Sequence, residues 1–236
     1  MIFPQDKEEK ESVKESDYLR EASVIEKSEG HEVLVGAARM AKYLPLLTDK
    51  KVGLLVNQTS MVGETHLVDT LLSIGVDIQT IFAPEHGFRG DHSAGTHVEH
   101  GIDKKTGLKI TSLYGKNRKP SAEMLKGLDI VIFDIQDVGV RFYTYISSMQ
   151  YMMEACSENG VHFMVLDRPN PNGHYVDGPV LEPKYKSFIG MHEVPLVHGM
   201  TVGEFAKMIM GEGWVKPADN YSLTVIPCDH YNHTTM

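Results

Sequence analysis

The stretch IQTIFAPEHGFRG, Ile78–Gly90, joins a short apolar run to a strongly polar end. The apolar part predicts a buried strand over Ile78–Ala83. Pro84 ends that strand because proline has no N–H for the sheet ladder, and Gly87 allows a backbone turn that other residues avoid. A buried strand that leads into a carboxylate, an imidazole and a guanidinium is typical of an α/β protein with its chemistry at the edge of a sheet.

Strand and helix patterns alternate along the rest of the chain. Apolar runs predict five further buried strands, at Val52–Val56, Lys109–Leu113, Asp129–Ile135, Val161–Leu166 and Leu223–Ile226. Helical spacing and turn residues predict helices at Val35–Leu47, Thr65–Ile74, Ser121–Lys126, Tyr143–Asn159 and Thr201–Met210. This alternation predicts an α/β fold with a mostly parallel sheet and helices on both faces.

Composition narrows the class of partner. The chain of 236 residues has 32 acidic and 23 basic residues and a net charge of −9, which argues against nucleic acid because phosphate binding needs a basic surface. The sequence has no apolar run of about 18 residues, so no membrane insertion is predicted. Cys156 and Cys228 lack the spacing of a metal motif and are expected to be unpaired thiols.

Polar side chains follow nearly every predicted strand. Ligands bind beyond the carboxyl ends of parallel strands, so these side chains form the candidate site. They are Asn57 and Gln58, Glu85 and His86, Tyr114, Asp134, Gln136 and Asp137, and Asp167, Arg168 and Asn170. Carboxylates that meet at one edge can split their pKa values, as acid–base chemistry requires. With nearby arginines and the tyrosines Tyr114, Tyr143 and Tyr145, the pattern favours a small polar substrate such as a carbohydrate.

Several of these residues also have a purely structural interpretation. Glu85 could cap a turn or pair with Arg89. Asp134 lies inside an apolar run, where an aspartate often serves as a structural hydrogen-bond hub. Asp137 and Arg141 could pair across one helical turn. Asp167 could simply end a strand in a turn.

A metal or a cofactor is less favoured. His86, His92, His97 and His100 lie within fifteen residues, but their spacing matches no helical metal motif. A metal-dependent hydrolase therefore stays the weaker alternative. No predicted strand leads into GxGxxG, and the sequence has neither a phosphate loop nor a GxSxG elbow, so no cofactor is predicted.

Five longer motifs occur in order along the chain and carry a resemblance to a known family. They are FAPEHGFRG (Phe82–Gly90), DIQDVGVRFYTY (Asp134–Tyr145), DRPNPNG (Asp167–Gly173), GPVLEP (Gly178–Pro183) and HGMTVGE (His198–Glu204). Over about Val35 to Ile226 the chain resembles the exo-β-N-acetylmuramidases of glycoside hydrolase family 171. The resemblance implies a Rossmann-like N-terminal domain, a C-terminal α+β domain and an active cleft between them. It further implies removal of N-acetylmuramic acid from the non-reducing ends of peptidoglycan fragments, without nucleotide or metal.

The resemblance also suggests roles for individual residues. Glu85 is the first choice for the catalytic general acid/base, with Asp134, Asp137 or Glu204 as its partner. The residues expected to bind substrate are Asn57, His86, Arg89, Arg141, Tyr143, Asp167, Asn170, Asn172, His198 and Glu204. The lactyl carboxylate of the substrate would give Arg141 or Arg89 a physical reason to be there.

The expected organisation has three parts. Residues 1–30 are rich in Lys and Glu and predict a disordered or weakly helical leader, without the apolar core of a signal peptide. Residues 31–226 are expected to form the Rossmann-like domain, and residues 227–236 to begin a linker to a second domain that is largely absent. Family members often act in the periplasm or outside the cell, so the localisation is left open. A non-catalytic domain that binds peptidoglycan sugars is the main alternative to a glycosidase.

Overall fold

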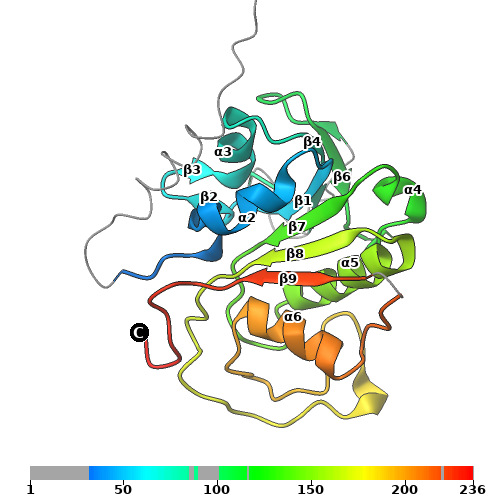
Figure 1. Ribbon diagram of the computed structural model, residues 1–236. Helices are drawn as coiled ribbons and strands as arrows, with labels where there is room; N and C mark the ends of the chain where they lie inside the picture. Colours follow the sequence, from blue (N-terminus) through cyan, green and yellow to red (C-terminus); the bar gives the residue numbers. More distant parts are fainter. Residues whose placement is uncertain (1–31, 85–87, 90–100, 116, 219–220, 236) are drawn as a thin grey trace, which may run out of the picture.

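The computed structural model describes residues 32–84, 88–89, 101–115, 117–218 and 221–235, which are organised around a seven-stranded sheet (Figure 1). In spatial order the strands are β5 (Gly101–Ile102), β6 (Lys109–Ser112), β4 (Ile78–Ala83), β1 (Val52–Val56), β7 (Ile130–Asp134), β8 (His162–Leu166) and β9 (Leu223–Ile226). Only the short edge strand β5 runs antiparallel to its neighbour. Numbered along the chain, the six parallel strands have the order 3-2-1-4-5-6, which is the Rossmann order.

The six predicted strands are confirmed, each within one residue of its expected ends. They were predictable because strands β1 and β7 at the centre of the sheet are buried on both faces and read as continuous apolar runs. Within the sheet, Leu54 of β1 pairs with Ile132 of β7 on one side and with Ile81 of β4 on the other.

Helices cover both faces of the sheet, as predicted. On one face, α2 (Met40–Leu47) and α3 (Leu67–Ser73) share a core cluster with Leu54 and Ile132. The opposite face carries α4 (Ala122–Leu125), α5 (Tyr145–Asn159) and α6 (Val202–Gly211). These helices share a second cluster with Leu55 and Phe133, so alternate residues of each central strand point to alternate cores.

Three predicted helices begin two or more residues later than expected. The helix expected from Val35 starts only at Met40, after the short 3₁₀ helix η1 (Gly36–Ala38). Gly36 lies against the sheet so closely that an added Cβ would be 2.3 Å from the Ile226 carbonyl oxygen. Side-chain periodicity does not reveal such a backbone contact, which explains the error.

The other two late starts also have local causes. The residues expected to begin α3 form β3 (Thr65–His66), which pairs antiparallel with β2 (Met61–Val62), and His66 Nδ1 then accepts the Val68 N–H at the start of the helix. The helix expected from Tyr143 begins at Tyr145, because the preceding residues form a turn.

Long loops connect the later elements. The segment after β8, which includes the 3₁₀ helix η2 (Pro183–Tyr185), runs past the outer side of α6 before that helix begins (Figure 1). Helix α6 has the predicted capping box, with Thr201 and Glu204 each accepting a backbone N–H of the other. After β9 the chain stays on the domain, since Leu34 pairs with Asp229. Both cysteines are free, as predicted. Within the described ranges, no helix is long and apolar enough to cross a membrane.

Candidate functional site

The loops that follow β1 and β7 meet at the carboxyl edge of the sheet, where the strand order reverses. The Ser60 hydroxyl donates to the carbonyl oxygen of Asp134. In the same place, the Gln136 N–H donates to Thr59 Oγ1 at 2.9 Å, and that hydroxyl donates to Asn57 Oδ1 at 2.6 Å. The reversal point of a Rossmann sheet is the usual place for a ligand. The structure therefore brings together the polar groups predicted after these two strands.

Asp134 is held in a buried ion pair. Arg168 donates from Nε to Oδ1 at 2.6 Å and from Nη2 to Oδ2 at 2.9 Å, which is a bidentate arrangement. Burial raises the pKa of Asp134, and the Arg168 guanidinium opposes that rise. Since both carboxylate oxygens are occupied, the geometry favours the structural interpretation of Asp134 over a catalytic one.

Asp137 keeps one carboxylate oxygen free. Oδ2 accepts the Gly139 N–H at 2.8 Å, whereas the buried Oδ1 has no hydrogen-bond partner among the described residues. Burial raises the pKa of Asp137 to about 7, although the N–H groups of Gly139 and Val138 oppose the rise. Such a carboxyl group can give up or take a proton near neutral pH.

Arg141 does not pair with Asp137. Its Nη1 donates to the carbonyl oxygens of Pro179 at 2.8 Å and Val194 at 2.5 Å. The alternative interpretation of a pair across one helical turn is therefore wrong, because the residues between Asp137 and α5 form a turn. Arg141 instead fastens the long loop after β8.

A neutral histidine lies next to Asp137. His198 Nε2 is 3.8 Å from Asp137 Oδ2, and burial lowers the pKa of His198 to about 4. His198 Nδ1 accepts the Met200 N–H at 3.3 Å, which assigns the ring proton to Nε2. Among the described residues that Nε2 has no hydrogen-bond partner. The structure thus places a spare donor beside a spare acceptor.

Tyr143 belongs to the same neighbourhood. Burial and the charge of Asp137 raise the pKa of Tyr143, and its ring packs edge-on against Tyr145 with centroids 5.0 Å apart. Tyr143 remains partly exposed.

Two of the predicted binding residues after β8 form hydrogen bonds with the segment that leads into α6. Asp167 accepts the Gly203 N–H at 2.7 Å and the Thr201 hydroxyl at 2.8 Å, so it fixes the start of α6 to the end of β8. Burial raises the pKa of Asp167, and these two hydrogen bonds oppose the rise. Asn170 Nδ2 donates to the Met200 carbonyl oxygen at 2.9 Å.

Two further predicted residues have comparable partners. Asn172 Nδ2 donates to the Val138 carbonyl oxygen at 2.8 Å. Glu204 accepts the Thr201 N–H at 2.9 Å through one oxygen and contacts His233 Nε2 at 3.0 Å through the other. These contacts shape the loop around Asp137 and occupy most of the polar atoms that were expected to bind substrate.

Arg89 is engaged in an ion-pair cluster away from Asp137. It donates to both oxygens of Asp69, at 3.0 and 3.1 Å, and to both oxygens of Asp103, at 2.9 and 3.1 Å. Lys105 also contacts Asp69, at 2.7 Å. Although burial opposes the effect, hydrogen bonds from Arg89 and Thr106 lower the pKa of Asp103 to about 2. The arrangement leaves few Arg89 donors for a substrate.

Part of the predicted site lies outside the described residues. This applies to Glu85 and His86, and equally to His92, His97 and His100. Their roles stay predictions. Among the residues that are described, no group of three or more His, Cys, Asp or Glu side chains is arranged to hold a metal ion.

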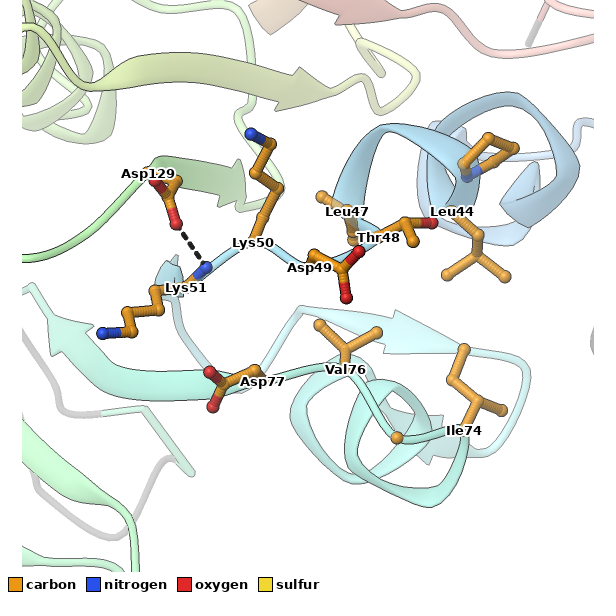
Figure 2. A pocket seen from close by; sticks show the side chains of 12 residues that line it. Leu44, Leu47, Thr48, Asp49, Lys50, Lys51, Ile74, Val76, Asp77 and Asp129 are labelled. Atoms are coloured by element: carbon orange, nitrogen blue, oxygen red, sulfur yellow. Dashed lines mark hydrogen bonds between the residues drawn. The ribbon is translucent and has the colours of Figure 1, made fainter. Parts of the chain in front are cut away.

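Among the described residues, two cavities lie at opposite edges of the sheet. The larger, about 500 Å³, opens at the amino edge between the ends of α2 and α3 and is lined by Leu47, Lys51, Val76 and Asp129, among others (Figure 2). A smaller cavity of about 140 Å³ lies at the carboxyl edge, between the end of β6 and the start of α5. Size alone would select the first, but the groups able to exchange a proton are at the carboxyl edge, so we place the candidate site there.

The smaller cavity contains a residue that the sequence reasoning missed. Arg118 lines it together with Leu113, Tyr114, Thr144, Ser148, Phe188 and Ile189. Tyr114 was noted as the polar end of a strand. Arg118 follows only four residues later, so a longer window after that strand would have included it.

Comparison with known proteins gives consistent matches. Residues 52–236 match the family model described as exo-β-N-acetylmuramidase NamZ, N-terminal. Peptidoglycan β-N-acetylmuramidase NamZ of Bacillus subtilis (strain 168) is 48% identical over 199 residues, which are 80% of this chain and 45% of that protein. Two crystal structures of DUF1343 family proteins from Bacteroides fragilis NCTC 9343 match with TM-scores of 0.77 and 0.79 at 48% and 38% identity. They cover 87% of this chain and 54% and 52% of their own, so the chain spans about half the length of these relatives.

Proposed function

Because this chain belongs to the family of NamZ exo-β-N-acetylmuramidase N-terminal domains, we propose that it is the N-terminal part of a glycoside hydrolase. The proposed reaction releases N-acetylmuramic acid from the non-reducing ends of peptidoglycan fragments. The observation that carries the proposal is Asp137, a buried carboxyl group with one free oxygen and a pKa of about 7 at the reversal point of the sheet.

Glycosidases of most families use two carboxyl groups that flank the scissile bond. Glu85 remains our first choice for the general acid/base. Of the three candidate partners, Asp134 is occupied by Arg168, and Glu204 by the capping box and His233. Asp137 alone of the three has a buried oxygen without a partner in the described part of the chain. We therefore assign Asp137 as the partner of Glu85.

Two neutral hydrogen-bond donors are suited to the hydroxyl and acetamido groups of the sugar. The Nε2 atom of His198 and the Nδ2 atom of Asn57 are buried and have no partners among the described residues. Amide and imidazole N–H groups of this kind bind hydroxyl and acetamido oxygens, and leaving them unpaired costs about 1–3 kcal/mol each. We assign these two donors to holding the sugar next to Asp137.

The test is hydrolysis of a chromogenic β-N-acetylmuramide by this chain and by three variants. Glu85→Gln and Asp137→Asn should each abolish release of N-acetylmuramic acid while circular dichroism stays unchanged. Asp49→Asn is the matched control, since Asp49 is exposed at the amino edge and has a left-handed φ of 56° that asparagine also adopts. Full turnover by Asp137→Asn would refute the assignment of Asp137.

A second candidate function is binding of peptidoglycan sugars without catalysis. It is favoured by the two buried donors, His198 Nε2 and Asn57 Nδ2, which could hold a sugar without any reaction. Saturable binding of N-acetylmuramic acid without hydrolysis would establish it in place of the glycosidase. Turnover that is lost in EDTA and restored by a metal ion would instead support the metal-dependent alternative. Absence of both binding and hydrolysis would contradict all three.

A further inference from the structure

Arg118 differs from the other arginines at the carboxyl edge of the sheet. Arg89 is bound to two aspartates, Arg168 to Asp134, and Arg141 to two backbone carbonyl groups. In the described part of the chain, the Arg118 guanidinium instead lies over the Phe188 ring, 4.2 Å from its centroid, and makes no hydrogen bond or ion pair. Its donors are therefore available to a ligand.

The cavity beside Arg118 is small. Its volume of about 140 Å³ is below the range of roughly 300–1,000 Å³ that is usual for cavities holding drug-sized ligands. A cavity of this size fits one substituent of a sugar better than a whole disaccharide.

The position of Arg118 is fixed by contacts to one helix. The neighbouring Lys119 bridges to Glu154 at 3.2 Å and to Glu158 at 2.8 Å, both on α5. The Phe188 ring stacks on Tyr151 of the same helix, with centroids 5.8 Å apart and planes 17° apart. The arginine and the ring beneath it are thus held before any ligand arrives, which reduces the entropy lost on binding.

The rest of the cavity suits an anion. Thr144 and Ser148, at the start of α5, line it beside Arg118. The first turn of α5 has no acidic residue, and Thr144 makes no side-chain cap, so no side chain of that turn neutralises the partial positive charge of the helix end.

Residues that line this cavity are next in sequence to residues near the proposed reaction centre. Thr144 follows Tyr143, whose pKa is raised by burial and by Asp137. On the other side, the Leu113 N–H donates to the carbonyl oxygen of Ala83 at 2.8 Å, at the end of β4. The inference therefore has a substrate at Asp137 extend a side group toward Arg118.

We propose that Arg118 binds the lactyl carboxylate of N-acetylmuramic acid and so selects this sugar over N-acetylglucosamine, which lacks the lactyl group. The inference rests on the proposed function. A guanidinium binds a carboxylate through two parallel, charge-assisted hydrogen bonds, and a neutral sugar lacks the negative charge that strengthens them. Arg118 takes the role that the sequence suggested for Arg89 or Arg141, because the donors of those two residues are largely occupied.

The test is calorimetric titration of the whole chain with N-acetylmuramic acid, with its lactyl methyl ester and with N-acetylglucosamine. The wild-type chain should bind the free acid roughly tenfold to a hundredfold more tightly than the other two sugars. Arg118→Ala should remove this preference and leave the affinity for N-acetylglucosamine unchanged. Lys50→Ala, which removes one positive charge at the amino edge, should keep the preference and is the matched control.

The outcomes separate the two proposals. Arg118→Ala that still prefers the free acid would overturn the inference and leave the proposed function intact. Equal binding of the three sugars by the wild-type chain would do the same. Loss of all binding in Arg118→Ala would also overturn it, because the arginine would then serve the whole sugar. A wild-type chain that binds none of the sugars would overturn the proposed function itself.

Discussion

The Nε2 atom of His198 lies 3.8 Å from the Oδ2 atom of Asp137, and both side chains are buried. Burial acts on the two groups in opposite directions, raising the pKa of Asp137 to about 7 and lowering that of His198 to about 4. Both residues are consequently neutral between pH 4 and 7. A negative charge appears at this position when Asp137 loses its proton above that range, and a positive charge when His198 gains one below it.

Replacing Asp137 with asparagine should stabilise the fold at neutral pH. Folded Asp137 holds its proton up to a pKa of about 7, whereas the unfolded chain releases it near 4. Between these values the folded state binds more protons, so the wild-type stability falls as the pH rises. Asparagine does not titrate, and Asp137→Asn should therefore gain about 3–4 kcal/mol at pH 7.5 and almost nothing at pH 4.

Urea unfolding at pH 4, 6 and 7.5 would measure this gain. The Asp49→Asn variant is the control for replacing an exposed aspartate. A stability difference between Asp137→Asn and wild type that stays constant across the three pH values would contradict the raised pKa. Together with lost turnover, a gain in stability would indicate that Asp137 is kept for function at a cost to the fold.

The buried Asp134–Arg168 pair should behave differently from an exposed pair. Arg168→Met would leave the carboxylate of Asp134 unpaired in the core, which costs about 3–5 kcal/mol. Lys126→Met is the matched control, because Lys126 and Glu123 are 3.8 Å apart on the surface and their loss should cost less than about 0.5 kcal/mol. Urea unfolding at pH 7 compares the two. If both variants lost a similar free energy of unfolding, the buried pair would contribute no more to stability than the exposed pair.

The sequence predicted the fold better than it predicted which side chains of the site pair with each other. The strands were visible because β1 and β7 are apolar along their whole length, a local property. The partner of Asp134 is not local, since Arg168 lies 34 residues away. Both residues were correctly placed at the carboxyl edge, but only the folded chain shows that they neutralise each other.

Arg89 and Arg118 illustrate the same limit. The family resemblance favoured Arg89 as a substrate contact because it stands in the motif FAPEHGFRG, yet its partners Asp69 and Asp103 are 20 and 14 residues away. Arg118 was not among the predicted site residues, because nothing in its neighbourhood in the sequence shows that Phe188 will lie beneath it. Which arginine keeps free donors is a property of tertiary structure.

The Arg89 cluster should stabilise the fold until acid protonates Asp103. The pKa of Asp103 is lowered to about 2, so its contribution is complete above pH 4, the pKa of the unfolded chain, and is lost as the pH falls toward 2. Asp103→Asn should lower the free energy of unfolding at pH 7 by about 1–3 kcal/mol. Urea unfolding at pH 7 and pH 2.5 should show this deficit shrinking in acid. A deficit of equal size at both values would exclude the charge as its cause.

Gly139 joins Asp137 to His198 through its backbone. Its N–H donates to Asp137 Oδ2 at 2.8 Å, and its carbonyl oxygen accepts the backbone N–H of His198 at 3.1 Å. It has a left-handed φ of 72°, and an added Cβ would lie 2.3 Å from Asn170 Nδ2. Gly139→Ala should thus cost about 1–2 kcal/mol from backbone strain, and more from displacing Asn170. It should also lower muramide turnover, because the strain falls between the two groups assigned to the substrate.

Gly211→Ala is the matched control for this variant. Gly211 ends α6, has no left-handed φ, and would meet no atom within 4 Å on gaining a Cβ, so alanine there should be neutral or stabilise by up to about 1 kcal/mol. Urea unfolding and the muramide assay on both variants give the comparison. If Gly139→Ala matched Gly211→Ala in both measurements, the backbone between Asp137 and His198 would be free to adjust. The 3.8 Å spacing of the two side chains would then not be fixed by that backbone.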